Sequence, residues 1–398
     1  MVVAAAARPP LRTLLLLNSL CMGGAEKQVV SLFNRLGDEG HQVFLLCLKE
    51  DRALLPQVDA ARLPGVLPDL RVASGVRWPA LRALARHIDE LEIDVLVCTN
   101  LYAFLYGWLA RRWCRRAGAL RLVEVFHSTD VGSRKDRGSM WLYRWLLRRA
   151  DLLVYVCHGQ AAQWRSRGLR SRQDMVIYNG VDTQHFEDHA TASDKAALRQ
   201  RHGFGAGDYV VGLCAVMRPE KAHGDLLRAL ALLRREGLDI KALLIGDGPE
   251  RAAIERQIAA LGLDDAVRIT GQLQDVRASV AACDVMALTT HVETFSIAAL
   301  EAMALGKPMV MTRSGGATEQ VHPGDNGLLY EAGDATALAS CLRQLADAAL
   351  RAEMGACAAQ RVRQRFGIDR MVRSYDAALR ALVDDSQVMS DPHPVAAH

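Results

Sequence analysis

The 398-residue sequence lacks the features of several common protein classes. It contains no apolar run near the roughly 20 residues that a membrane-spanning helix needs. Its nine cysteines are odd in number and include no C-x-x-C pair, which argues against a disulfide framework or a zinc site. The motifs H-E-x-x-H and G-x-x-x-x-G-K-[ST] are also absent. Since 50% of the residues are hydrophobic and 24% are charged, the composition is typical of a soluble protein of two or three domains.

The N-terminal residues do not have the pattern of a signal peptide. The apolar run Leu14–Leu17 is short and is followed at once by Asn18, and no basic start precedes a long apolar core. Such a run is typical of a buried strand. We therefore expect the protein to be cytoplasmic.

The net charge of +4 is unevenly distributed. Residues 103–173 contain fifteen Lys and Arg and four Asp and Glu, so this window carries +11 and the remainder −7. Five of the six tryptophans lie in the same window, namely Trp108, Trp113, Trp141, Trp145 and Trp164. In residues 140–150, Trp141, Arg144, Trp145 and Arg148 would share one helical face, and Arg111, Arg112, Arg115 and Arg116 form a second cluster.

A basic face with interleaved tryptophans predicts an anionic partner, such as the surface of an anionic membrane. The protein would then bind peripherally to the inner face of that membrane. The alternative is that the tryptophans simply pack on a sheet. We do not expect a nucleic acid partner.

Short apolar runs alternate with amphipathic helical segments along the whole chain. The runs occupy residues 13–18, 42–48, 94–99, 120–127 and 152–157, and then 209–216, 241–248, 266–271, 285–289 and 308–312. Strands that alternate with helices predict parallel sheets with right-handed crossovers. Two such series predict an α/β protein with two Rossmann-like domains.

The boundary between the two series should follow residues 179–182, because the next residues are polar and rich in turns. We place an N-terminal domain at residues 1–182 and a C-terminal domain at 183–368. A last helix is expected at 369–386 and a disordered tail at 387–398.

Residues 291–320, HVETFSIAALEAMALGKPMVMTRSGGATEQ, contain the most informative pattern. Glu293 and Glu301 are separated by seven residues, and a good helix former lies between them. Because Thr294 or Ser296 would cap that helix, Glu293 should lie in the preceding loop and Glu301 about two turns into the helix. The free amides of the helix start form an anion site between the two carboxylates. This arrangement suits a nucleotide sugar, with hydroxyls at both ends and phosphates between them.

The extended pattern ETFS…LEAMALGKPMV…GG..E resembles the E-x7-E signature of the retaining glycosyltransferases of family 4. GGAEK near the start, NGVD at 179–182, RPEK at 218–221 and GDGPE at 246–250 extend the resemblance over nearly the whole chain. The resemblance implies the GT-B fold, in which two Rossmann-like domains with parallel sheets face each other across a cleft and the last helix crosses back to the N-terminal domain.

The resemblance also implies the reaction and the roles of the domains, with an acceptor-binding N-terminal domain at 1–182 and a nucleotide-sugar-binding C-terminal domain at 183–368. A retaining glycosyltransferase would move a sugar from a nucleotide-diphosphate sugar, with UDP more common than GDP, to a hydroxyl of a glycan or lipid-linked acceptor. No D-x-D motif occurs, so we expect no metal and no cofactor besides the nucleotide sugar. Two alternatives stay open, a sugar-nucleotide 2-epimerase of the same fold and a non-catalytic nucleotide-sugar-binding protein.

The candidate site residues follow predicted strands, where doubly wound domains bind their ligands. The resemblance makes Glu293, His127 and Lys221 catalytic candidates, with His127 near the donor sugar, and places Asn100 on the acceptor side. The donor-binding candidates are Gly23, Gly24, Arg218, Lys221, Gly246, Gly248, Thr294, Phe295, Ser296 and Glu301. Lys221 matches the family lysine, but the family arginine five residues before it is Val216 here. Whether Arg218 replaces that arginine is open.

Overall fold

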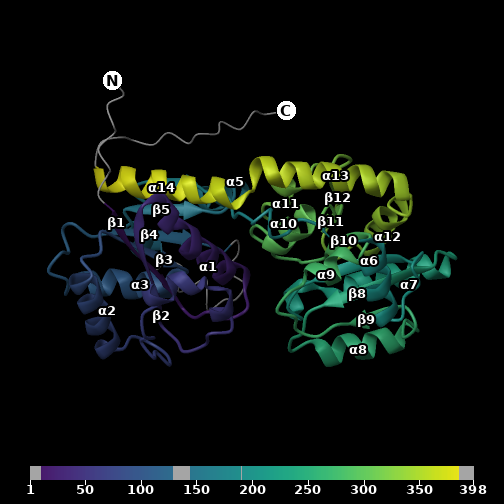
Figure 1. The fold of residues 1–398 in the computed structure, drawn as a ribbon, viewed down its shortest axis with the longest axis horizontal. Helices are drawn as coiled ribbons and strands as arrows, with labels where there is room; N and C mark the ends of the chain where they lie inside the picture. The colour runs from purple at the N-terminus through teal and green to yellow at the C-terminus, as the bar shows by residue number, and fades with distance from the viewer. Residues whose placement is uncertain (1–9, 129–143, 190, 385–398) are drawn as a thin grey trace, which may run out of the picture. The chain divides into compact units, whose positions relative to one another are not determined.

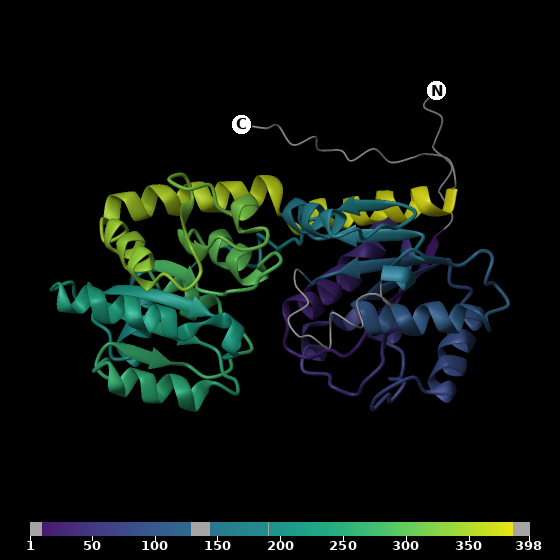
Figure 2. The same cartoon turned by 180° about the vertical axis from the view of Figure 1, so that it is seen from behind.

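The computed structural model describes residues 10–128, 144–189 and 191–384, and it divides into two compact units. The first unit comprises residues 1–179 and 368–398, and the second comprises 180–367. In the described residues each unit has one sheet of six parallel strands with helices around it (Figures 1 and 2). This confirms the predicted α/β class with two parallel sheets. The expected tail at 387–398 lies outside the described residues.

The first sheet has the strand order β2-β1-β3-β4-β5-β6. Its strands are β1 (Leu11–Leu17), β2 (His41–Cys47), β3 (Val95–Thr99), β4 (Arg121–Phe126), β5 (Leu152–Tyr155) and β6 (Asp174–Val176). The helices include α1 (Gly24–Leu36), α2 (Trp78–Glu90), α3 (Leu101–Arg111), α5 (His158–Ser166) and α14 (Ile368–Asp384). Because β2 and β3 flank β1 on opposite sides, the loops after β1 and β3 diverge at a topological switch point, where such sheets bind ligands.

The last helix, α14, belongs to the first unit and packs against α1 (Figure 1). The Gln28 side chain donates a hydrogen bond to the buried Tyr375 hydroxyl over 3.2 Å. His41 Nε2 lies 2.7 Å from Asp376 Oδ1, and Arg380 donates to the same oxygen over 2.6 Å. The helix is therefore held by polar contacts as well as by its apolar face.

The second sheet has the strand order β12-β11-β10-β7-β8-β9. Its strands are β7 (Tyr209–Cys214), β8 (Ile240–Ile245), β9 (Val267–Ile269), β10 (Val285–Leu288), β11 (Met309–Thr312) and β12 (Gly327–Tyr330). Its helices are α6 (Ala192–Arg201), α7 (His223–Arg235), α8 (Arg251–Ala260), α9 (Arg277–Ala281), α10 (Ile297–Ala304), α11 (Ala317–Gln320), α12 (Ala335–Gln344) and α13 (Ala348–Arg365). The chain leaves β7 toward β8 and leaves β10 toward β11, so the switch point lies between β7 and β10.

One acidic residue lies in the core of the first unit. Glu124, in β4, is fully buried and pairs in register with Cys98 of β3 and Leu153 of β5. Neither of its carboxylate oxygens has a hydrogen-bond partner within the described part of the chain. Burial therefore raises the pKa of the Glu124 carboxyl well above its ordinary value.

We expect Glu124→Gln to stabilise the protein at neutral pH but not in acid. Below the unfolded pKa, about 4.5, both side chains are neutral, so the melting temperatures should be similar. As the pH rises toward the pKa of Glu124 in the folded state, the free energy of unfolding of the wild type falls by up to about 1.4 kcal/mol per pH unit. It falls because this carboxyl ionises freely only in the unfolded state. Melting curves at pH 4.5 and 7.5 measure this. An equal difference at both pH values would contradict the account.

Candidate active site

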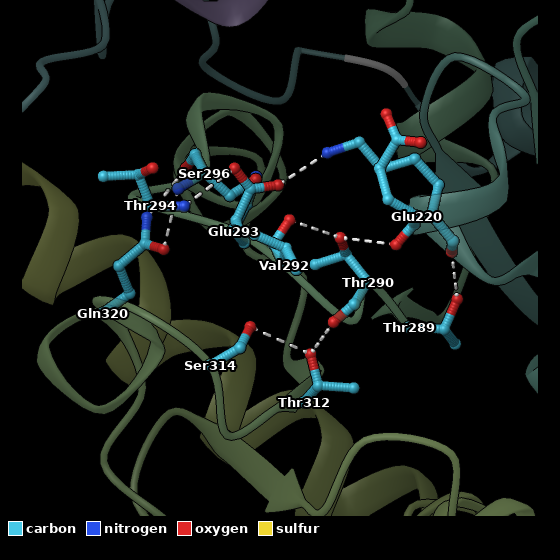
Figure 3. A network of polar contacts seen from close by, with 12 residues as sticks. Glu220, Thr289, Thr290, Val292, Glu293, Thr294, Ser296, Thr312, Ser314 and Gln320 are labelled. Carbon is cyan, nitrogen blue, oxygen red and sulfur yellow. Dashed lines mark hydrogen bonds and ion pairs between the residues drawn. The ribbon is translucent and has the colours of Figure 1, made fainter. Parts of the chain in front are cut away.

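An ion pair occupies the switch point of the second sheet. Lys221 ends the short 3-10 helix that follows β7, and Glu293 lies in the loop between β10 and α10. Lys221 Nζ and Glu293 Oε2 are 2.7 Å apart, and both side chains are partly buried. Figure 3 labels Glu293 and marks the ion pair of its carboxylate with a dashed line. The fold thus joins two candidates that are 72 residues apart in the sequence.

Threonine side chains tie the two loops together. Thr289 Oγ1 donates to the carbonyl oxygen of Lys221 over 2.8 Å, and Thr290 Oγ1 donates to that of Glu220 over 3.0 Å. The amide of His291 also donates to the carbonyl of Glu220, over 2.9 Å. These contacts fix the backbone on both sides of the ion pair (Figure 3).

The start of α10 has the geometry predicted from the sequence. Ser296 is the N-cap, and its hydroxyl accepts from the amide of Ala299 over 3.2 Å. Glu301 lies in the helix and is buried. The amides of Ile297 and Ala298 have no acceptor among the described residues, so they can bind an anion.

Gln320 holds this N-cap from the opposite side. Its side-chain oxygen accepts from the Ser296 amide over 3.1 Å, and its nitrogen donates to the Ser296 carbonyl over 2.7 Å (Figure 3). Of the neighbouring candidates, Thr294 is buried, and the buried Phe295 ring packs edge-on against Phe366, with centroids 5.4 Å apart. The helix start is therefore rigid.

The backbone of the turn after β11 is in close contact with the backbone of the Glu293 loop. Gly315 has a φ of +53°, and a Cβ at this position would lie 1.8 Å from the Glu293 carbonyl oxygen. The amide of Gly316 donates to the Thr294 carbonyl over 2.7 Å. Only glycine fits at position 315, because both the positive φ and the close backbone exclude a side chain.

The GDGPE loop after β8 packs against the loop after β7. Gly246 and Gly248 have φ of +144° and +158°, and their Cβ atoms would lie 2.2 and 2.5 Å from the carbonyl oxygens of Ala215 and Met217. Arg251, at the position where a third glycine would complete a G-x-G-x-x-G pattern, bonds to Asp247 over 2.9 Å. These glycines thus permit a close contact between backbones; their contact with the nucleotide stays a prediction.

The candidates in the first unit lie at the carboxyl ends of adjacent strands. Gly23 and Gly24 begin α1 after β1, Asn100 caps α3 after β3, and His127 follows β4. Asn100 has φ +74° and ψ 149°, a strained conformation for a residue other than glycine, and such strain is common at functional sites. Burial lowers the pKa of His127 to about 4, so its ring is neutral at pH 7.

The described residues, 10–128, 144–189 and 191–384, contain neither a cluster of metal-ligating side chains nor a helix that could cross a membrane. No group of three or more His, Cys, Asp and Glu side chains there could hold a metal ion. In the same residues, no helix is both long and apolar enough to cross a membrane.

Comparisons with known proteins place this chain in a family. Residues 194–361 match the family described as "Glycosyl transferases group 1", and residues 22–185 match "Glycosyltransferase Family 4". A GDP-mannose-dependent alpha-(1-6)-phosphatidylinositol monomannoside mannosyltransferase of Mycolicibacterium smegmatis is 32% identical over 301 residues, which cover 73% of this chain and 75% of the relative. The chain belongs to this family of glycosyltransferases. A second relative, N-acetyl-alpha-D-glucosaminyl L-malate synthase of Bacillus anthracis, is 28% identical over 80% of this chain and 81% of its own length.

Solved structures establish that the glycosyltransferase has the GT-B fold. The structure of Anabaena Alr3699/HepE in complex with UDP is 26% identical, has a TM-score of 0.80 and covers 93% of this chain and 100% of its own. Sucrose-phosphate synthase from Thermosynechococcus elongatus, at 20% identity and a TM-score of 0.78, shares the fold over 94% of this chain and 100% of its own.

Several residues that hold the site of the glycosyltransferase were not predicted from the sequence. Thr289, Thr290 and Gln320 bond to the loops of Lys221 and Glu293 or to the start of α10. Thr289 ends a predicted strand and Thr290 follows it, which is a weak signal. Gln320 follows the Glu of the GG..E pattern, but nothing in the sequence relates it to Ser296.

Lys221→Ala should reduce the activity of the glycosyltransferase more than Arg218→Ala. Lys221 is partly buried and contacts Glu293, whereas the Arg218 side chain is exposed on the same loop. Loss of a cation beside a leaving diphosphate costs about 100-fold or more in kcat, and we expect less than about tenfold for Arg218→Ala. Steady-state kinetics of both variants measure this. The opposite ranking would show that Arg218 has replaced the arginine missing at Val216.

Proposed function

We propose that this glycosyltransferase moves a sugar, with retention of anomeric configuration, from a nucleotide-diphosphate sugar to a hydroxyl of a glycan or lipid-linked acceptor. The observation that carries the proposal is the cluster of Lys221, Glu293 and the start of α10 at one switch point. It combines a cation and free amides for phosphate with carboxylates for hydroxyls.

Each group has a distinct role in the proposed reaction. Lys221 and the amides of Ile297 and Ala298 stabilise the charge that grows on the diphosphate as its bond to the anomeric carbon breaks. Glu293 accepts hydrogen bonds from sugar hydroxyls, and Glu301 accepts them from hydroxyls at the other end of the donor. The acceptor oxygen forms the new bond on the same face, and its proton passes to a diphosphate oxygen. His127, which is neutral at pH 7, offers a hydrogen bond to the sugar without adding charge.

The donor is inferred from known structures. Solved complexes of Anabaena Alr3699/HepE contain UDP and UDP-glucose, whereas the mycobacterial relative is named for GDP-mannose. We infer a uridine nucleotide, because the Anabaena structure matches this chain over 93% of its length. For the acceptor we propose a precursor of a lipid-linked or cell-surface glycan, which a peripheral enzyme on the cytoplasmic face of a membrane would reach.

We expect a chelator to leave the transfer rate within about twofold of its normal value. Lys221 and the helix amides would supply the charge stabilisation that a divalent ion gives elsewhere. The measurement compares initial rates of the metal-free enzyme with EDTA and with added magnesium or manganese. Complete loss in EDTA, with recovery on adding manganese, would refute a metal-independent mechanism.

A labelled nucleotide-sugar panel tests the proposal. NMR of the product should show the anomeric configuration of the donor. An isomerised nucleotide sugar without transfer would identify an epimerase, and binding without turnover would identify a non-catalytic nucleotide-sugar-binding protein. An inverted product would refute retention while leaving the transferase activity intact.

A further inference from the structure

Four tryptophans of the first unit form two contacting pairs, which are linked along the chain through the neighbours Arg112 and Trp113. Trp78 at the start of α2 and Trp113 after α3 have ring centroids 5.2 Å apart. The Arg112 guanidinium lies 4.0 Å from the Trp108 ring centroid, and that ring meets Trp145 at 5.4 Å. Arg149 in turn lies over Trp145, at 4.8 Å. We call these rings, with the exposed arginines described below, the tryptophan–arginine surface.

Three of these four rings are exposed, whereas Trp108 is partly buried and packs against the core of the first unit. Trp78, Trp113 and Trp145 expose 62%, 42% and 39% of their area. Trp164 is fully buried, packs against Phe126 and donates its indole N–H to the Ser128 carbonyl. Trp141, which the sequence placed on the same face, lies outside the described residues. Clustered exposed aromatic rings indicate a contact surface rather than packing of the core.

The charge around these rings is positive and not neutralised. Residues 101–121 contain five arginines and no acidic residue. Arg111 and Arg116 pair with Asp151 and Asp94. Seven further arginines are exposed and have no carboxylate partner within the described part of the chain, namely Arg77, Arg82, Arg86, Arg112, Arg115, Arg148 and Arg149.

Spacing brings these arginines to the same side as the rings. Arg82 and Arg86 follow Trp78 by four and eight residues along α2, so the three share one face. Arg148 and Arg149 follow Trp145 by three and four residues. Helix α2 packs beside α3 (Figure 1), and the contact between Trp78 and Trp113 joins the start of α2 to the residues just after α3.

We propose that the tryptophan–arginine surface docks the enzyme on an anionic phospholipid bilayer. Indole rings prefer the interface between lipid and water, and unpaired arginines attract lipid phosphates. Arginines that stack on tryptophans, as Arg112 and Arg149 do, can bind headgroups while the rings enter the interface. This inference deepens the proposed function, because it names the surface on which a lipid-linked acceptor would be met.

Co-sedimentation of the full chain with vesicles tests the inference. Wild type should pellet with phosphatidylcholine–phosphatidylglycerol vesicles at low salt, bind less at high salt and bind little to phosphatidylcholine alone. The double variant Arg112→Glu, Arg149→Glu should bind at least about 25-fold more weakly, since each cation lost costs about fivefold. Arg201→Glu, Arg256→Glu is the matched control, because both arginines are exposed in the second unit, and it should bind normally.

The aromatic part has its own readout. Brominated lipids should quench the tryptophan fluorescence of the wild type, and Trp78→Ser, Trp113→Ser should lose most of that quenching at an unchanged melting temperature. Three results would overturn the inference. The wild type could bind neutral and anionic vesicles equally, or the matched control could lose as much vesicle binding as the double variant. The protein could also bind only a soluble polyanion such as dextran sulfate. Transfer to a soluble acceptor without vesicle binding would also overturn it, yet leave the proposed function standing. Vesicle binding without any transfer would support the docking surface and contradict the proposed function.

Discussion

Glu293→Gln is expected to lower the rate of glycosyl transfer by about two to three orders of magnitude, and also to tighten the binding of the free nucleoside diphosphate. Glutamine loses the charge that strengthens hydrogen bonds to sugar hydroxyls in the transition state. It also breaks the 2.7 Å ion pair that occupies Lys221 when no donor is bound. The freed ammonium can then bind the diphosphate without first leaving its partner.

Calorimetric titration with UDP and steady-state kinetics measure the two effects. Because the Lys221–Glu293 pair is about one-fifth exposed, its loss should improve UDP affinity by no more than about fivefold. Glu301→Gln is the informative comparison, since it should mainly weaken donor binding and leave Lys221 paired. Near-normal turnover of Glu293→Gln would remove this residue from the mechanism, and weaker UDP binding would contradict the competition for Lys221.

Gly315→Ala should reduce transfer by about 100-fold or more. The added methyl would lie 1.8 Å from the Glu293 carbonyl oxygen, so the Glu293 loop or the turn after β11 must move. A shift of about 1 Å in a group that positions a substrate costs this much in rate. The kcat of the purified variant with a saturating nucleotide sugar measures the effect.

Gly324→Ala provides the control for backbone strain. Gly324 also has a positive φ, +86°, but a Cβ there would meet no atom within 4 Å. Gly324→Ala should lose about 1 kcal/mol of stability from the left-handed backbone alone, and Gly315→Ala should lose more because its methyl also displaces backbone atoms. Only Gly315→Ala should lose most of its activity. Equal activities would show that the contact between Gly315 and Glu293 does not position the site.

The sequence predicted the two parallel sheets and the local geometry of α10 because both depend on patterns of short range. Apolar runs that alternate with helical segments specify the strands, and Ser296 lies where a capping hydroxyl was expected. The strand order, which brings the ends of β7 and β10 together, was not predicted. The resemblance to family 4 assigned Lys221 and Glu293 to one site, although not to an ion pair.

The contacts that hold the site could not be predicted, because they join residues without a shared pattern. Gln320 bonds to Ser296, and Gly315 fits against Glu293, only after the turn that follows β11 has packed on the loop of β10. Gly246 and Gly248 of GDGPE are donor-binding candidates, but their close contacts with the carbonyls of Ala215 and Met217 were not predicted. The unpaired state of Glu124 in the core was also not predicted, because the sequence of an apolar strand does not indicate whether its glutamate forms a hydrogen bond.

The most direct test of the site is the thermal stability and turnover of wild type and Glu293→Gln with a panel of nucleotide sugars in the presence of EDTA. We predict that one uridine diphosphate sugar raises the melting temperature of both proteins, and that only the wild type transfers its sugar and releases UDP at a substantial rate. If no nucleotide sugar stabilises the wild type, or if Glu293→Gln transfers as fast as the wild type, the Lys221–Glu293 site is not the centre of the reaction.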